Sequence, residues 1–253
     1  MAEVEFQVED GVAVITINRP EAKNAVTLAV SEGVAAGLDE ISKRPDIKVG
    51  IITGAGGTFC AGMDLKAFLR GEIVRLKDRG FAGITQARLE KPMIAAVEGY
   101  ALGGGFEIAI ACDLIVAAEN AKFGLPEVKR GLVANAGGLV RLPHQIPTRI
   151  AAEMVLTGDL VEPARLLQYG LINQVTKPGE ALAGARSLAE KIAANGPLAI
   201  AASRRVMSEC RDWSQDELFD RQAGITGAIF TSADAREGAK AFAEKRKPEW
   251  QSA

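Results

Sequence analysis

The chain has 253 residues, of which 48% are hydrophobic and 25% are charged, so it is long enough to bury the core of one large domain. Thirty Lys and Arg residues against 32 Asp and Glu residues give a formal charge of -2, without the basic excess that binding to a phosphate backbone requires. We therefore expect no nucleic-acid partner. Because no apolar run reaches the roughly 18 residues of a membrane span, we also expect no membrane partner.

Cysteine, histidine and the first residues bear on location and on metal chemistry. Cys60, Cys112 and Cys210 lack metal-like spacing, and an odd count without a secretory signal favours inert thiols in a reducing compartment. Residues 1–10 contain four acidic and no basic residues, the reverse of a signal peptide. The single histidine, His144, is predicted to be a surface residue in a turn, so His-rich metal sites are not expected. We therefore predict a cytoplasmic protein without a metal.

The first half of the chain predicts alternating strands and helices. Residues 12–18 are rich in β-branched side chains and end in turn-forming residues, which is typical of a strand. Apolar residues recur at helical spacing over residues 27–41. Further strands are predicted at residues 49–53, 93–97 and 114–118, and a glycine-started helix at residues 103–111. This order predicts an α/β core.

The last third of the chain predicts helices. Alanine- and leucine-rich stretches cover residues 151–156, 163–169, 182–194 and 197–210. Pro163 and Pro197 suit first-turn positions, and Gly196 separates two of these helices as a C-cap glycine does. We expect an α/β core over residues 1–195 and a C-terminal helical region over residues 196–253.

A glycine-rich turn leads into the first candidate catalytic residue. Gly103, Gly104 and Gly105 stand between a predicted strand and a helix, where missing side chains let backbone N–H groups approach a ligand. Close helix packing would also explain these glycines. Glu107 follows in an apolar first turn, where a carboxylate is costly unless it is paired or used. On the pattern alone, a helix-dipole role for Glu107 stays open.

A second carboxylate, Glu127, follows Pro126 shortly before another glycine-rich stretch. By itself it is an ordinary acid at the start of a helix. Glu107 and Glu127 cannot share one helix face, because a predicted strand separates them. If the fold brings them together, paired acid–base chemistry becomes possible.

Several blocks of the sequence, taken in order and spacing, resemble the enoyl-CoA hydratase (crotonase) family. They are residues 61–64 (AGMD), 91–92 (KP), 99–107 (GYALGGGFE), 112–113 (CD), 121–127 (AKFGLPE) and 242–246 (FAEKR). The resemblance implies a crotonase-like spiral of β-β-α units in which the C-terminal helical region mediates trimerisation. It also implies an acyl-coenzyme A thioester as substrate, no separate cofactor, and a homotrimer or a hexamer built as a dimer of trimers.

The resemblance also assigns roles to particular positions. Backbone N–H groups of Met63 and Gly104 would form an oxyanion hole for the thioester carbonyl. Glu107 would orient and deprotonate water for addition at Cβ, and Glu127 would supply the proton to Cα. The positions matched to coenzyme A binding are Ala61, Asp64, Lys66, Phe242 and Lys245, the last two reaching the coenzyme from a neighbouring subunit. A solvated basic tail is the other interpretation of Lys245.

The leading hypothesis is reversible hydration of a trans-2-enoyl-CoA, as in fatty acid β-oxidation. Residues 132–135 (LVAN) depart from the common family pattern near the acyl group, and residues 69–88 match a variable segment over the acyl pocket, so acyl specificity stays open. Double-bond isomerisation and hydration of crotonobetainyl-CoA (carnitinyl-CoA dehydratase activity) are the sister hypotheses. An idle acyl-CoA-binding scaffold is the non-enzyme alternative. A dinucleotide oxidoreductase is disfavoured, because no glycine fingerprint follows the N-terminal strand.

Overall fold

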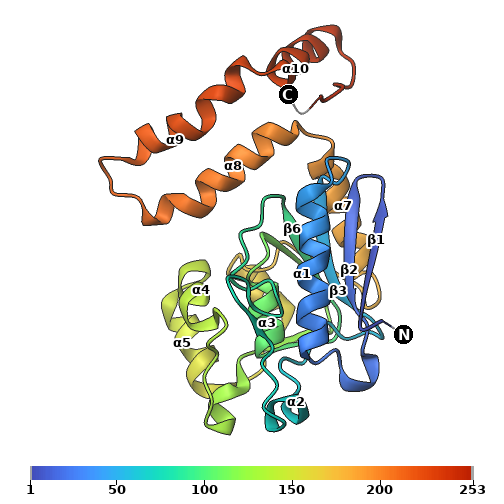
Figure 1. Ribbon diagram of the computed structural model, residues 1–253. Helices are drawn as coiled ribbons and strands as arrows, with labels where there is room; N and C mark the ends of the chain where they lie inside the picture. The colour runs from blue at the N-terminus through green and yellow to red at the C-terminus, as the bar shows by residue number, and fades with distance from the viewer. Residues whose placement is uncertain (1, 252–253) are drawn as a thin grey trace.

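A six-stranded sheet organises the computed structural model, which describes residues 2–251 (Figure 1). Its strands, in spatial order, are β1 (Val4–Glu9), β2 (Val12–Ile17), β3 (Val49–Gly54), β6 (Met93–Val97), β8 (Leu114–Ala118) and β10 (Gln174–Thr176). The β1 strand pairs with β2 in antiparallel fashion, and every other pair is parallel. The inner strands are buried on both faces, as their continuous apolar sequences require.

Alternate residues of these strands pack into two different core regions. Ala13 and Ile15 point to the face that α1 (Leu28–Lys43) covers, whereas Val12 and Val14 point to the face that α7 (Ala181–Ala193) covers. The period of two along a strand therefore sets which helix each side chain meets. Thr27 caps α1 by accepting a hydrogen bond from the Val30 amide at 3.2 Å.

A second, smaller layer of strands positions the site. The β7 strand (Tyr100–Leu102) follows β6 and pairs in parallel with β9 (Lys122–Gly124), which follows β8. Single bridges extend this layer, from Ala101 to Cys60 on one side and from Phe123 to Val161 on the other. Successive turns of the chain thus add one strand to each layer, which confirms the predicted crotonase-like spiral of β-β-α units.

Shorter elements fill the connections between these strands. They are η1 (Pro20–Ala22), α2 (Leu65–Leu69), β4 (Arg75–Leu76), β5 (Gly80–Phe81), α3 (Gly104–Ala109), η2 (Pro126–Arg130), α4 (Gly138–Gln145), α5 (Thr148–Thr157) and α6 (Pro163–Gln168). Of these, α3 starts directly after β7, and η2 starts directly after β9. The two candidate glutamates lie on these two elements.

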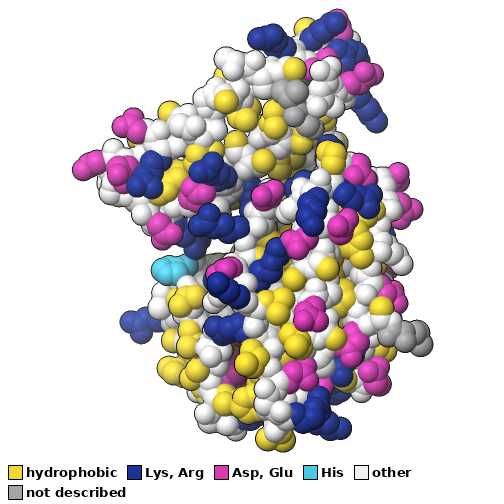
Figure 2. Space-filling view, in the orientation of Figure 1, with side chains coloured by type: hydrophobic (Ala, Val, Ile, Leu, Met, Phe, Trp, Pro, Cys, Tyr) yellow, Lys and Arg dark blue, Asp and Glu magenta, His cyan; other side chains and the backbone are white. Residues whose placement is uncertain are grey.

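The C-terminal helices extend away from the sheet (Figure 1). They are α8 (Pro197–Glu209), η3 (Cys210–Asp212), α9 (Leu218–Thr226), η4 (Gly227–Thr231) and α10 (Ala233–Glu244). Arg204 of α8 connects them to the core through Asp113, at 2.9 Å. Apolar side chains gather along α8 and α9 and over α4 and α5 (Figure 2). Large side chains that α8 to α10 leave mostly exposed are Met207, Phe219, Phe230 and Phe242.

The strands and helices expected from the sequence are present, with ends that differ by a few residues. The boundary expected at residue 195 falls between α7, which packs on the sheet, and α8. The role of residues 196–253 in trimerisation stays a prediction. The turn predicted around His144 is wrong, because this exposed residue lies in α4 with Pro143 inside the helix. Within residues 2–251, no helix is long and apolar enough to span a membrane.

Candidate active site

Glu107 lies in the first turn of α3 and is only 2% exposed. Its Oε1 accepts hydrogen bonds from the amides of Ala136, at 2.7 Å, and Gly138, at 2.8 Å. These donors come from the loop before α4 and from the first residue of that helix. An ideal Cβ on Gly138 would lie 3.1 Å from the same oxygen, so glycine lets the backbone approach the carboxylate closely. The fold therefore buries this carboxylate but holds it with fixed donors.

Glu127 reaches the same place from η2, where it occupies the first turn. Its Oε1 lies 2.9 Å from the position that a Cβ on Gly103 would take. Gly103 is the N-cap of α3, and its φ of 54° lies in the left-handed region. Within the described chain, Oε2 of Glu127 is buried and has no hydrogen-bond partner. The structure thus brings Glu127 over the start of the helix that carries Glu107.

Burial raises the pKa of both carboxyl groups. For Glu107, desolvation is the largest cause, and it is opposed by the amides of Gly138 and Ala136 and by the charges of Arg75 and Arg141. For Glu127, desolvation is again the largest cause, and the nearby charge of Glu107 raises its pKa further. Four groups lower the pKa of Glu107, namely two amides and two arginines, whereas two groups lower the pKa of Glu127. The amide donors of Ala136 and Gly138 therefore favour ionisation of Glu107, whereas the charge of Glu107 opposes ionisation of Glu127.

In the part of the chain that the structure describes, two backbone amides beside the glutamates have no acceptor. The Val26 amide donates to Gly62 O at 2.8 Å, and the Asp64 amide donates to Val26 O at 3.0 Å, which forms a parallel bridge between Val26 and Met63. In such a bridge the amide of the middle residue, Met63, points away from the strand that carries Val26. Gly104 is the first residue of α3, where an amide has no partner within the helix. An ideal Cβ on Gly62 would lie 3.3 Å from Gly104 N, so these segments are adjacent. Within residues 2–251 neither amide has a recorded partner. The pair can therefore bind an oxygen that carries developing negative charge.

The predicted coenzyme-binding residues fall into two groups. Ala61, Asp64 and Lys66 lie at or just before α2, next to Met63. Asp64 already has structural partners: its Oδ1 caps α2, and its Oδ2 pairs with Arg19 at 3.2 Å. Lys66 is exposed.

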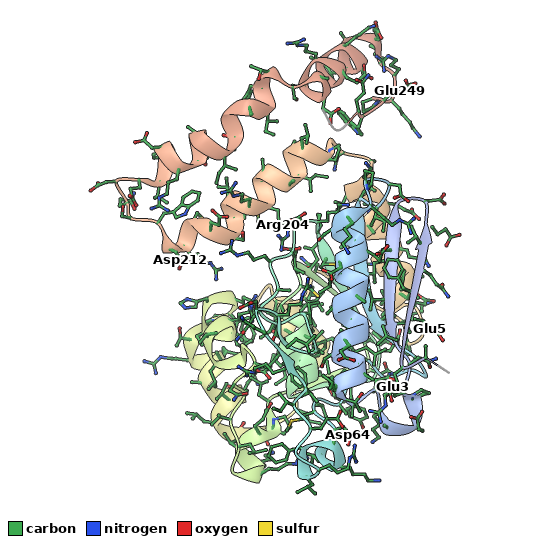
Figure 3. All side chains as sticks on the ribbon, viewed as in Figure 1. Glu3, Glu5, Asp64, Arg204, Asp212 and Glu249 are labelled. Atoms are coloured by element: carbon green, nitrogen blue, oxygen red, sulfur yellow. The ribbon has the colours of Figure 1, made fainter. Side chains whose placement is uncertain are left out.

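Phe242 and Lys245 lie at the opposite end of the molecule. Phe242 is in α10 and is 87% exposed, and Lys245 is the C-cap of that helix. Figures 1 and 3 place α10 and Glu249 far from α2 and Asp64. Within one chain, these two residues therefore do not join the group around Met63.

Sequence reasoning missed several contributions to the site. Arg141 is half-buried near Glu107, and its Nη2 donates to Thr85 O at 2.5 Å. The ring of Phe81 packs against Gly104, since an ideal Cβ there would lie 2.4 Å from Phe81 Cε1. The amide donors of Ala136 and Gly138 were also missed. The glycine pair at residues 137–138 was the one signal in the sequence that a backbone approaches closely there.

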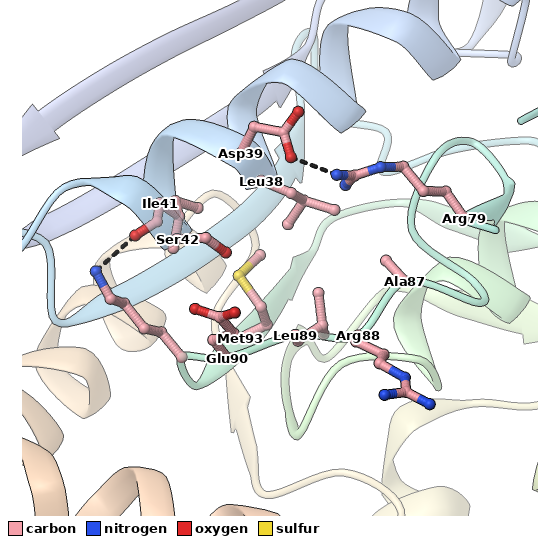
Figure 4. A pocket seen from close by; sticks show the side chains of 11 residues that line it. Leu38, Asp39, Ile41, Ser42, Arg79, Ala87, Arg88, Leu89, Glu90 and Met93 are labelled. Atoms are coloured by element: carbon pink, nitrogen blue, oxygen red, sulfur yellow. Dashed lines mark hydrogen bonds and ion pairs between the residues drawn. The ribbon is translucent and has the colours of Figure 1, made fainter. Parts of the chain in front are cut away.

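Two hollows of the structure lie away from the glutamates. One, of about 180 Å³, is lined by the end of α1 and the start of β6, where Asp39 pairs with Arg79 and Lys91 donates to Ile41 O at 2.6 Å (Figure 4). Another, of about 200 Å³, lies near His144 and Arg211. Neither contains Glu107 or Glu127. The described residues contain no group of three or more His, Cys, Asp or Glu side chains that could hold a metal. The convergence of polar groups defines the candidate site.

Comparison with known proteins agrees with this arrangement. Residues 7–253 match the enoyl-CoA hydratase/isomerase family. The chain therefore belongs to this family. Over 93% of both chains it is 43% identical to a carnitinyl-CoA dehydratase of Salmonella arizonae. It is also 43% identical to an enoyl-CoA hydratase of Mycobacterium tuberculosis, over 94% of this chain and 92% of that protein. A crystal structure of an enoyl-CoA hydratase from M. tuberculosis superposes with a TM-score of 0.98 at 54% identity, covering 100% of both chains.

Proposed function

We propose that this protein is an enoyl-CoA hydratase that adds water reversibly to a trans-2-enoyl-CoA thioester. The observation that carries the proposal is the convergence of Glu107 and Glu127 beside the free amides of Met63 and Gly104. Relatives named as hydratase and dehydratase support the same reaction type. No separate cofactor is needed, because coenzyme A is part of the substrate.

The proposed mechanism begins at the thioester carbonyl, whose oxygen accepts hydrogen bonds from the Met63 and Gly104 amides. Glu107, the carboxylate of the pair, takes a proton from water as the water oxygen forms a bond to Cβ. The electron pair of the Cα–Cβ double bond moves toward the carbonyl, and the resulting enolate charge falls on the oxygen that the two amides hold. Preformed donors stabilise this charge without reorganising.

Glu127 completes the addition. As the neutral acid of the pair, it gives its proton to Cα, which restores the thioester carbonyl and leaves a 3-hydroxyacyl-CoA. Glu107 is then protonated and Glu127 ionised, and proton exchange with solvent resets both groups. Among residues 2–251 no group bonds to the buried Oε2 of Glu127, which supports this role because a buried carboxyl oxygen without a donor is more stable in the neutral acid.

Coenzyme binding and assembly are part of the same proposal. Ala61, Asp64 and Lys66 lie next to Met63, which suits contacts with the coenzyme that follow the thioester. Phe242 and Lys245 would act on the site of a neighbouring subunit in a trimer or hexamer. The exposed aromatic side chains of α9, η4 and α10 support such an assembly, because Phe219, Phe230 and Phe242 are 77%, 81% and 87% exposed in one chain. We place the enzyme in the cytoplasm and in fatty acid metabolism.

The direct test is loss of the ultraviolet absorbance of the conjugated enoyl thioester, with purified protein and crotonyl-CoA. We expect wild-type protein to decrease this absorbance with time. In Glu127→Gln the rate of decrease should be at least about 100-fold lower, because the variant lacks the general acid. Glu119→Gln is a matched control, because Glu119 is exposed on the turn after β8 and should leave the rate unchanged. Equal rates for wild type and Glu127→Gln would contradict the mechanism. No bleaching by wild type with crotonyl-CoA or longer enoyl-CoAs would contradict the function.

A further inference from the structure

One side chain joins a segment that is variable in the family to a segment that departs from the common family pattern. Arg75 lies in β4, within the variable segment between α2 and β6, and Asn135 lies in the loop before α4. Arg75 Nη2 donates to the backbone oxygen of Asn135 at 3.0 Å and to its Oδ1 at 3.4 Å. These two bonds hold the guanidinium of Arg75 between β4 and the loop before α4.

This position is close to the candidate catalytic groups on both sides. In the β4–β5 hairpin, Arg75 is paired with Phe81, whose ring packs against Gly104. On the other side, Asn135 precedes Ala136, whose amide donates to Glu107 at 2.7 Å. The charge of Arg75 also lowers the pKa of Glu107, whereas Arg75 is not among the groups that shift the pKa of Glu127. Arg75 thus stands on the Glu107 side of the site.

That side is where the acyl substituent must continue. In the proposed mechanism Glu107 acts at Cβ, and the remainder of the acyl chain begins at this atom. Ile73 and Val133 precede Arg75 and Asn135 by two residues each, and their side chains are 73% and 60% exposed. An acyl group that extends past Cβ on the Glu107 side therefore approaches the guanidinium of Arg75.

The guanidinium of Arg75 is available to a ligand. Within residues 2–251 it forms no ion pair, and its Nε and Nη1 have no recorded acceptor. Arginine keeps its charge throughout the pH range of activity and can bind a carboxylate through two N–H groups. Arg141 adds a second positive charge near Glu107. A quaternary ammonium group is instead attracted by aromatic faces or carboxylates.

We propose that Arg75 is a specificity-determining residue, whose guanidinium, held by Asn135 at the acyl end of the site, favours acyl groups ending in a carboxylate and disfavours those ending in a quaternary ammonium. The preference for uncharged acyl groups lies between the preferences for these two classes. This inference rests on the proposed function and adds the class of acyl group. It also separates this chain from an enzyme adapted to crotonobetainyl-CoA.

Three enoyl-CoA probes of similar size test the inference: glutaconyl-CoA with a carboxylate, crotonobetainyl-CoA with a trimethylammonium group, and its neutral tert-butyl isostere. We expect wild-type protein to prefer the neutral probe over the cationic one by about tenfold in kcat/KM, as one unit charge several Å away in a partly solvated site predicts. Arg75→Met should remove most of this preference and most of the preference for glutaconyl-CoA. Arg75→Glu should reverse the order, while the kcat/KM for the neutral probe shows that each variant is folded.

Arg70→Met is the matched control, because Arg70 lies in the same segment but pairs with Glu72 at 3.3 Å. It should leave the order of the probes unchanged. Calorimetry with the saturated forms of the three acyl-CoAs, on wild type and Arg75→Met, measures charge preference without turnover. The crotonyl-CoA assay tests the proposed function separately, and calorimetry decides the inference even if wild type hydrates none of the three probes. The same order of affinities in wild type and Arg75→Met would overturn it and leave the contact with Asn135 a purely structural one.

Discussion

The amide of Gly138 donates to Oε1 of Glu107 at 2.8 Å, across 31 residues of sequence. A side chain at Gly138 would also meet Ala134 and Leu125, each 3.1 Å from an ideal Cβ, so the loop cannot accept a methyl group without moving. The position of the carboxylate and the packing of the loop before α4 are therefore set by the same close approach.

Gly138→Ala should lower activity more than stability. The added methyl group displaces the amide or the carboxylate, and a misplaced base costs roughly 10- to 100-fold in kcat. Steady-state kinetics with crotonyl-CoA and a thermal unfolding curve measure both effects. Gly224→Ala is the control, because nothing lies within 4 Å of its ideal Cβ and alanine favours the helix α9. Unchanged kcat in Gly138→Ala would mean that the contact does not position Glu107.

The pH dependence of hydration should report Glu107. Because burial raises its pKa, activity should be lost as the pH falls through a value above that of an ordinary glutamate, about 4.3. Arg141 opposes this shift, so Arg141→Met should raise the pKa of Glu107 further and move the acid limb of kcat/KM to higher pH. Profiles of wild type, Arg141→Met and the exposed control Arg149→Met, which shifts the pKa of neither glutamate, measure the displacement. Identical acid limbs in all three would show that Arg141 does not act on the titrating group.

The sequence indicated candidate residues for the site but did not indicate their electrostatic environment. Glu107, Glu127 and the glycines before α3 were found from their residue types and the family spacing. The short strands β7 and β9 were missed, because three-residue strands show no measurable period. The β1 strand was missed although its residues alternate between intermediate and exposed positions, as expected at an edge of a sheet.

Contacts between distant segments were beyond sequence reasoning. Arg75 and Arg141 are separated from Glu107 by more than 30 residues on either side, and nothing in their immediate sequence indicates a shared partner. The family spacing suggested a coenzyme contact for Asp64, and the structure adds what the spacing did not indicate: one of its oxygens caps α2 and the other pairs with Arg19, 45 residues away. Roles that depend on the three-dimensional neighbours of a charge cannot be read from its place in a motif.

Removal of the Glu127 charge should stabilise the fold above mildly acidic pH. Because the pKa of Glu127 is higher in the folded chain than in the unfolded one, the folded chain binds more protons between these two values. Its free energy of unfolding therefore falls as the pH rises through this window. Glu127→Gln lacks this contribution, so its advantage over wild type in free energy of unfolding should be small at pH 4 and larger at pH 8. Urea unfolding at both pH values, with Glu119→Gln as control, measures the difference. An advantage that does not grow with pH would contradict the raised pKa.

The three thiols should differ sharply in reactivity. Cys60 and Cys112 are buried, and burial raises the pKa of Cys60 to about 12 and raises that of Cys112 as well. Thiolates are the reactive form, so neither should react in the folded protein, whereas Cys210 is partly exposed in η3. Native protein should consume about one equivalent of a thiol reagent, and Cys210→Ser almost none. In denaturant, wild type should consume three equivalents, one for each cysteine. Because Cys60 lies directly before the segment that carries Met63, its modification in native Cys210→Ser, with parallel loss of hydration, would show instead that this segment opens in solution.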